Sequence, residues 1–370
     1  MTKEPNPAHA PDGRIPPGNR RRDWLVAVLL VFILGVGGLV LRSGLVTFGR
    51  QNRLFRGKPE TEWIKNLKYW DDQQVKEWQG YGEEGVQVLI RGLQKANHPG
   101  ERAYRRFYRL IPASIARWLP APKNDSTQAT RQCVVSLLSS LGTNATSATP
   151  VMLWAVTKDE SDSVRQSALC YFNSSEDDNC ILNKLPAGQK AALLPALLNA
   201  VQNSPNWGLR NNAALALRYY PEQQKVVAPV LLKALQDSQP QVRLLAAEAL
   251  NRVNPEAARK AGITSILVAI SKNPDDQIAF RAVAALGHAG SQPELAVPAL
   301  IECLKSKNNL VACQAVWALE WSGKEFAAYS NTIVPALSNA AQRKDNVGWY
   351  AKNALARWTV TSGATPGATK

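Results

Sequence analysis

Apolar residues recur along the C-terminal two thirds of the chain in pairs of helix-length segments separated by short polar turns. From Ala192 to Tyr220, one apolar segment contains Pro195, and a polar turn and a second segment rich in Ala and Leu follow. Further segments with this arrangement begin at Ala148, Ala228, Gly262, Val297 and Val334. From Pro195 onwards the prolines, with Thr264 in one of their places, are separated by 34, 35, 34 and 37 residues. A period in this range predicts an array of stacked helical repeats.

Each recurring position has a physical role. Proline is tolerated in the first turn of a helix, because its missing N–H would have no intrahelical partner there. In the first segments, leucines such as Leu231, Leu232 and Leu235 recur at helical spacing, which predicts one buried face. Alanine pairs such as Ala246 and Ala247 in the second segments let helices of adjacent repeats approach closely. One helix pair cannot bury its apolar face alone, so the repeats are expected to stack.

The pattern resembles the HEAT repeat family and the related armadillo and phycobilisome-lyase-type helical repeats. The resemblance covers roughly residues 80 to 358 and rests on the opening proline, a turn Asp, a Val-Arg pair and an Ala-Ala-x-Ala-Leu stretch. In HEAT repeats the turn Asp and the helix Arg pair as a ladder between repeats. The resemblance therefore implies a structural ladder of Asp159, Arg165, Arg210, Asp237, Arg243, Asp275 and Arg281. Ala312 and Gly348 stand where Arg would be, so the last joints are expected to lack the ladder.

The sequence thus predicts an all-α protein, a right-handed α-solenoid of about seven HEAT-like helix pairs preceded by one N-terminal transmembrane helix. The expected parts are a disordered tail (1–23), a transmembrane anchor (24–41), a basic linker (42–57), a helical cap (58–85), the repeat array (86–358) with an insertion (97–126), and a disordered C-terminal tail (359–370). In the cap, Trp63, Leu67 and Trp70 are spaced to share one helix face. With Trp78 they are expected to cover the first repeat; an aromatic binding cleft is the alternative.

The uncharged run from Trp24 to Leu41 predicts a membrane-spanning helix. Its eighteen residues give about 27 Å at a rise of about 1.5 Å per residue, close to the thickness of the hydrocarbon core of a bilayer. Three arginines precede the run and favour a cytoplasmic N-terminus, although basic residues also follow it. We therefore expect a retained anchor with the repeats on the extracytoplasmic side, which is the periplasm in a bacterium. A cleaved signal and a cytoplasmic array are the alternatives. The pairing of anchor and repeats resembles uncharacterised membrane-anchored bacterial HEAT-repeat proteins.

The charge distribution bears on possible partners. Of a net charge of +15, residues 1–125 carry +9, residues 126–199 carry −1 and residues 200–370 carry +7. A basic balance that is densest beside a predicted membrane segment suits anionic lipid or nucleic acid. Hydrated Lys and Arg side chains on helix surfaces are the simpler interpretation.

The insertion contains the most distinctive amphipathic segment. An apolar stripe at helical spacing consists of Tyr104, Phe107, Tyr108, Ile111 and Ile115. Arginines lie largely on the other side, an arrangement that suits a membrane interface or an anionic partner. The candidate binding residues are Arg102, Arg105, Arg106, Arg109 and Trp118. The alternative is an extra helix packed on the array with hydrated arginines.

The sequence contains no recognisable catalytic motif. The three histidines, His9, His98 and His288, are far apart, and there is no glycine-rich phosphate loop. We therefore expect no catalytic residues, metal or cofactor. None of the five cysteines forms a CxxC motif, but Cys303 and Cys313 could be joined across a helical hairpin in an oxidising compartment. Two buried free thiols are the alternative.

From these features we expect a non-catalytic scaffold that binds a protein partner along the concave face of a solenoid. This expectation depends on analogy at the level of the fold, which does not fix function. One alternative is a lyase-like or other enzyme subunit built on HEAT repeats. The other is a nucleic-acid or anionic-lipid binder that uses the basic N-terminal third. The sequence indicates no small-molecule substrate.

Overall fold

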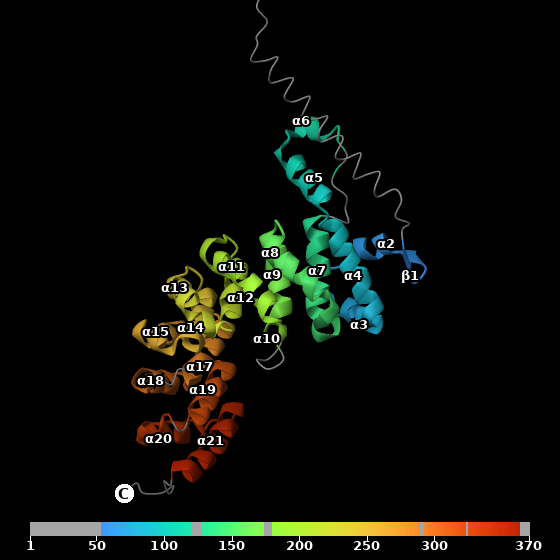
Figure 1. Cartoon of the computed structure of the whole chain (residues 1–370). Helices are drawn as coiled ribbons and strands as arrows, with labels where there is room; N and C mark the ends of the chain where they lie inside the picture. Colours follow the sequence, from blue (N-terminus) through green and yellow to red (C-terminus); the bar gives the residue numbers. More distant parts are fainter. Residues whose placement is uncertain are drawn as a thin grey trace, which may run out of the picture. The chain divides into compact units, whose positions relative to one another are not determined.

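The computed structural model describes residues 53–119, 121, 127–173, 180–288, 292–322 and 325–362 (Figure 1). They form two compact units, the first with residues up to Lys65 and Lys95–Thr127, the second with Asn66–Gln94 and the chain from Gln128 onwards. The predicted membrane segment, Trp24–Leu41, lies outside the described residues. So do the predicted N-terminal tail and most of the predicted linker and C-terminal tail. Among the described helices, none is both long and apolar enough to cross a bilayer.

The first unit contains a small hairpin and short helices. Strand β1 (Leu54–Phe55) pairs antiparallel with β2 (Lys58–Pro59), and helix α2 (Glu60–Lys65) follows directly. The unit also contains α5 (Pro99–Leu110) and α6 (Ala113–Ala116), which belong to the predicted insertion. The indole Nε1 of Trp63 donates a hydrogen bond of 2.9 Å to the carbonyl oxygen of Phe55, and this bond links α2 to the hairpin.

Two predictions about amphipathic helices are wrong in this region. Helix α5 ends at Leu110, and Ile111 has an extended backbone because Pro112 disfavours the helical conformation in the residue before it. The stripe predicted from Tyr104 to Ile115 is therefore not one helix face. Likewise α2 ends at Lys65, while Trp70 has a φ of 55° and is 69% exposed. Trp63 and Trp70 therefore do not share a helix face.

The second unit is an all-helical repeat array, as predicted. Its helices are α3 (Asp72–Gly80), α4 (Gly82–Ala96), α7 (Gln128–Leu141), α8 (Thr149–Lys158), α9 (Asp162–Phe172), α10 (Ile181–Lys184), α11 (Ala187–Asn203), α12 (Trp207–Leu217), α13 (Gln224–Ala234), α14 (Pro240–Val253), α15 (Pro255–Lys260), α16 (Ile263–Ile270), α17 (Asp276–His288), α18 (Pro293–Cys303), α19 (Asn309–Trp321), α20 (Ser330–Ala340) and α21 (Asn346–Ser362). Short 3₁₀ segments lie at Gly142–Ala148, Pro221–Gln223 and Ala327–Tyr329.

From α8 onwards the helices pair as α8/α9, α11/α12, α13/α14, α16/α17, α18/α19 and α20/α21. The second helices pack on one another in series, from α7 through α9, α12, α14, α17 and α19 to α21. Figure 1 shows this arrangement clearly for α18 and α20, which lie beside α19 and α21. Each second helix from α9 to α19 therefore lies between two others, as stacking requires.

The packing of the second helices depends on small residues. Ala213, Ala214, Ala246 and Ala247 are completely buried. At Gly287 in α17, an added Cβ would lie only 2.8 Å from the Cβ of Ala318 in α19. Neighbouring second helices thus approach closely because these positions lack larger side chains.

The prolines that mark the period have a different position from the predicted one. Helices α11, α13, α18 and α20 begin several residues earlier, so Pro195, Pro229, Pro298 and Pro335 lie inside them. Each proline still lacks the backbone N–H that a helix interior would use. The residues before each proline extend the helix by one turn or more towards the N-terminus, which the proline pattern did not indicate.

Candidate functional site

The turns between the first and second helix of each repeat contain a recurring polar position. In the α8–α9 turn, Asp159 accepts a hydrogen bond of 2.9 Å from the N–H of Ser161, two residues later. Asp237 accepts the same bond from Gln239 in the α13–α14 turn, also at 2.9 Å. The equivalent residues of three other turns also lie two residues before the residue that precedes the second helix, and each accepts this hydrogen bond: Ser204, Asn273 and Ser306. We call this residue the turn position of the ladder.

At two joints the turn position forms an ion pair with the preceding repeat. Arg131 in α7 donates from Nε (2.9 Å) and Nη2 (3.0 Å) to the two carboxylate oxygens of Asp159, and both side chains are 1% exposed. Arg210 in α12 binds Asp237 in the same way, at 2.7 and 3.0 Å, with both side chains largely buried. Two-point arginine–carboxylate pairs fix the relative orientation of both groups. The implied ladder therefore exists at these two joints.

The structure also corrects the membership of the ladder. Arg131, which pairs with Asp159, was not among the expected residues. The ladder arginine is the fourth residue of its second helix, as in Arg165, Arg210 and Arg243. In the last helix this position is held by Trp349 rather than Gly348.

Two expected ladder residues have other roles. Asp275 caps α17 by accepting hydrogen bonds from the N–H groups of Gln277 and Ile278, while Asn273 holds the turn position. The sequence-based assignment was thus displaced by two residues. Arg243 donates from Nη1 to the carbonyl oxygen of Asp237 in its own turn, at 2.8 Å.

At the joint between α9 and the next repeat, the ladder is incomplete. Arg165 has the ladder position on α9, but the turn position opposite is Ser204 rather than an Asp. Arg165 Nη2 pairs instead with Asp162 of its own helix, and the second oxygen of Asp162 accepts a hydrogen bond from the Ser204 hydroxyl. Burial alone would raise the pKa of Asp162, but these bonds from Ser204 and Arg165 lower it below its usual range. Asp162 therefore stays ionised.

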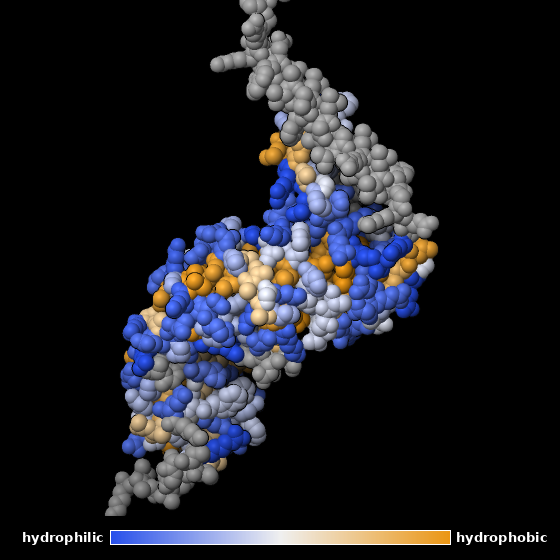
Figure 2. All heavy atoms as spheres, viewed as in Figure 1, coloured by the Kyte–Doolittle hydropathy of each residue, from blue (hydrophilic) through white to orange (hydrophobic). Residues whose placement is uncertain are grey.

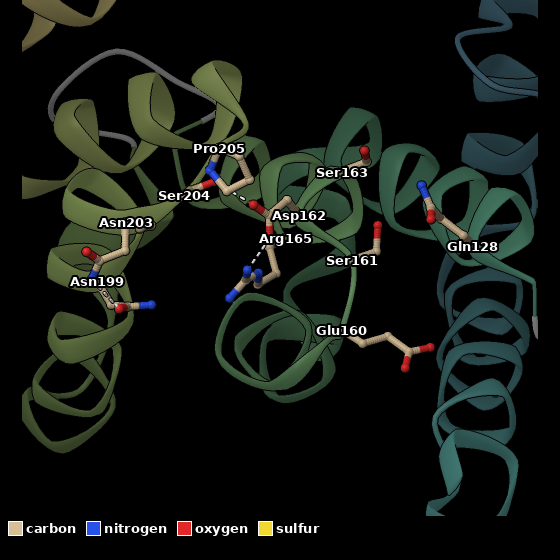
Figure 3. A pocket seen from close by; sticks show the side chains of 11 residues that line it. Gln128, Glu160, Ser161, Asp162, Ser163, Arg165, Asn199, Asn203, Ser204 and Pro205 are labelled. Carbon is tan, nitrogen blue, oxygen red and sulfur yellow. Dashed lines mark hydrogen bonds and ion pairs between the residues drawn. The ribbon is translucent and has the colours of Figure 1, made fainter. Parts of the chain in front are cut away.

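A cavity of about 430 Å³ opens at this joint. Its lining is polar and comes from α7, the α8–α9 turn, α9, α11 and the α11–α12 turn. Figure 3 shows Asp162 and Arg165 between Asn199 and Asn203 of α11 on one side and Glu160 on the other. The cavity is thus formed where the regular ion pair of the ladder is missing.

A second candidate site lies on the second helices of the C-terminal repeats. On α19, Leu310, Gln314, Trp317 and Trp321 follow one another at intervals of four, three and four residues, which places them on one helix face. None of the four is buried, and Trp321 is 75% exposed.

Rings of adjacent helices continue this surface. Tyr350 of α21 lies 5.1 Å from Trp317 and 4.9 Å from Trp349, measured between ring centroids. The ring centroids of His288 of α17 and Trp321 are 6.4 Å apart. We call the surface formed by His288, Leu310, Trp317, Trp321, Trp349 and Tyr350 the aromatic face.

Arg281 lies on α17, seven residues before His288. Its Nη2 lies 3.6 Å from a carboxylate oxygen of Glu248 on α14, and its side chain is 47% exposed. Arg281 therefore pairs from second helix to second helix and not with a turn residue, contrary to its implied ladder role. First helices also expose apolar side chains: Val226 of α13 is 50% exposed, and Figure 2 shows apolar patches in this region of a mostly hydrophilic surface.

The arginines predicted to bind in the insertion differ in accessibility. Arg105 is 6% exposed and donates a hydrogen bond of 2.7 Å to the carbonyl oxygen of Ala96, so it supports the fold rather than a surface. Arg106 and Arg109 are exposed, and Arg102 is half-buried. Trp118 is 78% exposed, with the guanidinium carbon of Arg117 5.4 Å from its ring centroid.

The two cysteines that could be joined across a hairpin are not bonded to each other. Cys303 and Cys313 are free thiols, and burial raises the pKa of both, which reduces their thiolate fraction. Among the residues that the structure describes, no three His, Cys, Asp or Glu side chains are grouped so that they could hold a metal ion.

The geometry of stacked helix pairs defines the class as an α-helical repeat protein. Residues 194–261 and 263–357 match the family model described as HEAT repeats, so this part of the protein is similar to HEAT-repeat arrays. The match includes both the Arg210–Asp237 pair and the aromatic face. A comparison with curated proteins finds no match.

Among solved structures, the protein is similar to YibA of E. coli, with 14% identity, a TM-score of 0.39, and coverage of 70% of this chain and 97% of that one. It is also similar to importin beta, with 14% identity, a TM-score of 0.43, and coverage of 84% and 46%. For Kap95 in a complex with Nup1, the identity is 13%, the TM-score 0.43, and the coverage 74% and 40%. The matches thus span less than half of the importin beta and Kap95 chains.

Proposed function

We propose that this protein is a membrane-anchored HEAT-repeat scaffold that binds a protein partner through its second helices and has no catalytic role. The observation that carries the proposal is the aromatic face. Trp321, Trp349 and Leu310 are 75%, 62% and 56% exposed on adjacent second helices. Large exposed apolar side chains gathered on neighbouring helices are uncommon unless a partner covers them.

The chemistry of the aromatic face suits a protein ligand. Trp and Tyr are enriched at the energetic centres of protein interfaces, because each buries a large area while losing few rotamers. The Trp317 ring packs edge-on against Tyr350, at an interplanar angle of 80°, so the cluster is partly ordered before binding. Ordering in advance reduces the entropy lost when a partner binds.

Site-specific photo-crosslinking in cells tests this proposal. A photoreactive amino acid replaces Trp321 or Trp349 in the full-length protein, and the matched control replaces Val226, which is exposed to a similar degree on a first helix. We expect one discrete protein adduct from the two aromatic-face sites and none from the control. Adducts of equal yield from all three positions, or from none, would overturn the proposal.

The anchoring part of the proposal has its own experiment. We propose that residues 24–41 hold the protein in a membrane with the repeats on the extracytoplasmic side. Protease added to spheroplasts should then digest an epitope tag placed after Lys370. A tag that is digested only after the membrane is opened would place the array on the cytoplasmic side and contradict this orientation.

A second candidate function, binding to anionic lipid, is favoured by the surface of the first unit. Trp118 and Leu110 are 78% and 84% exposed, and the exposed Arg106 and Arg109 belong to the same segment. The double variant Arg106→Gln, Arg109→Gln should weaken flotation of the protein with anionic vesicles, and added salt should do the same. Equal flotation of variant and wild type would exclude this role for the two arginines.

A further inference from the structure

The two complete ion pairs of the ladder show which group is missing at the joint of Arg165. At two joints, a carboxylate on the turn position binds the Nε and Nη2 edge of the arginine opposite, at Arg131–Asp159 and Arg210–Asp237. At the joint of Arg165, the turn position is Ser204, which keeps the local hydrogen bond of the turn but has no carboxylate. One carboxylate is therefore missing from a position that the same array fills twice.

Asp162 replaces the missing group only in part. It contacts Arg165 at Nη2, whereas the Nε of Arg165 is buried and has no hydrogen-bond partner among the described residues. In the complete pairs, Nε is bound to the carboxylate. A buried donor without a partner is unfavourable, because it has lost its hydration without a replacement. Of the two groups that bind the carboxylate in the complete pairs, the Nη2 of Arg165 is thus taken by Asp162 and the Nε has no acceptor among the described residues.

The cavity supplies space and donors at this edge. Asn199 and Asn203 of α11 and Ser161 before α9 belong to its lining, and their amide and hydroxyl groups can donate hydrogen bonds to an anion. α9, an eleven-residue helix, begins at the cavity with Asp162 and Ser163. The start of a helix favours negative charge.

Two carboxylates in the lining have compensating arginines. Glu160 lies 3.6 Å from Nη2 of Arg131 and therefore interacts with the neighbouring complete pair. Asp162 is the direct competitor, because it shares Arg165 with any incoming anion. Displacement of Asp162 towards Ser204, with which it already shares a hydrogen bond, would leave Arg165 to the ligand.

We propose that this cavity binds a carboxylate of a protein segment, which takes on Arg165 the place that Asp159 takes on Arg131 and Asp237 takes on Arg210. The carboxylate belongs either to an acidic side chain or to the free C-terminus of a polypeptide. The inference rests on the proposed protein-binding function, but it concerns a site separate from the aromatic face.

Two arrays of immobilised tetrapeptides test the proposal with the full-length protein in detergent. One array has amidated C-termini and an internal Asp or Glu, the other has free C-termini and no acidic side chains, and amidated neutral peptides are the blank. We expect binding above the blank in at least one array, and which array responds identifies the source of the carboxylate. Arg165→Met should weaken that binding by about tenfold or more, the effect of losing a charge-assisted hydrogen bond.

A second variant distinguishes a specific loss of peptide binding from misfolding of the protein. Ser204→Asp supplies the ladder carboxylate, and it is combined with Asp162→Asn because the Ser204 hydroxyl contacts the Asp162 carboxylate. This double variant should have a higher Tm than Asp162→Asn alone and should not bind peptide. Asp162→Asn alone removes the competing charge and should tighten binding. Binding that is absent from both arrays, or that is unchanged in the double variant, overturns the proposal. Trp321→Ser with Trp349→Ser should leave peptide binding to the cavity intact, so failure of the aromatic face and failure of the cavity are distinguishable.

Discussion

Between α7 and α14, the joints of the array include buried arginine–carboxylate pairs, whereas between α17 and α21 the ladder positions hold Ala279 and Ala312. In the first region, Arg131 and Asp159 are almost fully removed from water. In the second region, Gly287 and Ala318 bring α17 and α19 into close contact. Small buried residues pack the second helices in both regions, and the first region adds directional ion pairs that the second lacks at these positions.

In the last C-terminal joint, the arginine that donates hydrogen bonds across the repeats lies on the turn and not on the preceding second helix. In the α20–α21 turn, Arg343 holds the turn position, two residues before Asp345, whose carboxylate accepts a hydrogen bond from the N–H of Gly348. Arg343 donates from Nη1 to the carbonyl oxygens of Leu304 and Ser306 in the preceding repeat, at 2.9 and 3.2 Å. The positive charge thus lies on the turn instead of on the preceding helix. A joint can keep a cross-repeat hydrogen bond after its carboxylate is lost, and the stability of the two regions should respond differently to pH.

The largest effect is expected from Asp159→Asn. The variant removes the two-point carboxylate partner of the buried Arg131 and leaves Glu160, 3.6 Å from Nη2, as a weaker replacement. Breaking a buried pair typically costs about 3–5 kcal/mol. The free energy of unfolding, measured by urea titration, should fall by this amount. Replacing both residues by apolar ones, as in Arg131→Met with Asp159→Leu, should recover part of the loss. A cost below about 1 kcal/mol for Asp159→Asn would show that the buried pair does not hold this joint.

A smaller and pH-dependent effect is expected from Asp237→Asn. A hydrogen bond to a charged group contributes about 1.5–3 kcal/mol. Burial tends to raise the pKa of Asp237, but bonds from Arg210 and the N–H of Gln239 lower it below its ordinary value of about 3.9. Its stabilisation is therefore present above about pH 4 and is lost as the pH falls through the lower folded-state pKa. Thermal unfolding at pH 7 and pH 2.5 checks this, and an equal difference between variant and wild type at both pH values would contradict it.

Close packing in the second region can be tested with Gly287→Ala. The added Cβ would lie 2.8 Å from the Cβ of Ala318 and 3.0 Å from its Cα, so α17 and α19 must separate slightly. Overpacking of this kind costs about 1–3 kcal/mol. Gly188→Ala in α11 is the matched control, because its Cβ would meet nothing within 4 Å and Ala favours a helix. If both variants are equally stable at pH 7, the close contact does not limit this joint.

The sequence predicted the repeats well because their period and their alanine pairs reflect local packing. It predicted individual ladder contacts less well, because the ladder depends on register. The run "NPDDQ" contains two Asp residues, and Asp275 was assigned to a position that Asn273 holds. Arg131 was missed because Thr130, not Val, precedes it, and because the insertion separates it from α4.

The cavity at Arg165 could not be predicted from residue types, because it depends on what is absent from the opposite turn. One signal was available: the interval from Arg165 to Arg210 is longer than the intervals between the other ladder arginines. The aromatic face had a clearer signal, since Leu310, Trp317 and Trp321 share one helical stripe with no acidic or basic residue in it. Both sites became recognisable only when neighbouring repeats were placed side by side.

The smallest effect is expected from Arg281→Gln, which tests whether burial sets the strength of an ion pair between repeats. Arg281 and Glu248 are the same kinds of residue as those in the ladder, but they are 47% and 23% exposed and 3.6 Å apart. Exposed pairs contribute about 0–1 kcal/mol and weaken with salt. The variant should therefore unfold within about 1 kcal/mol of wild type, and the difference should vanish in about 1 M NaCl. Arg210→Gln is the matched control, because the same substitution there removes a largely buried two-point pair and should cost clearly more. Equal losses in the two variants would mean that burial does not set the strength of these pairs, and the distinction between the two regions of the array would then need another cause.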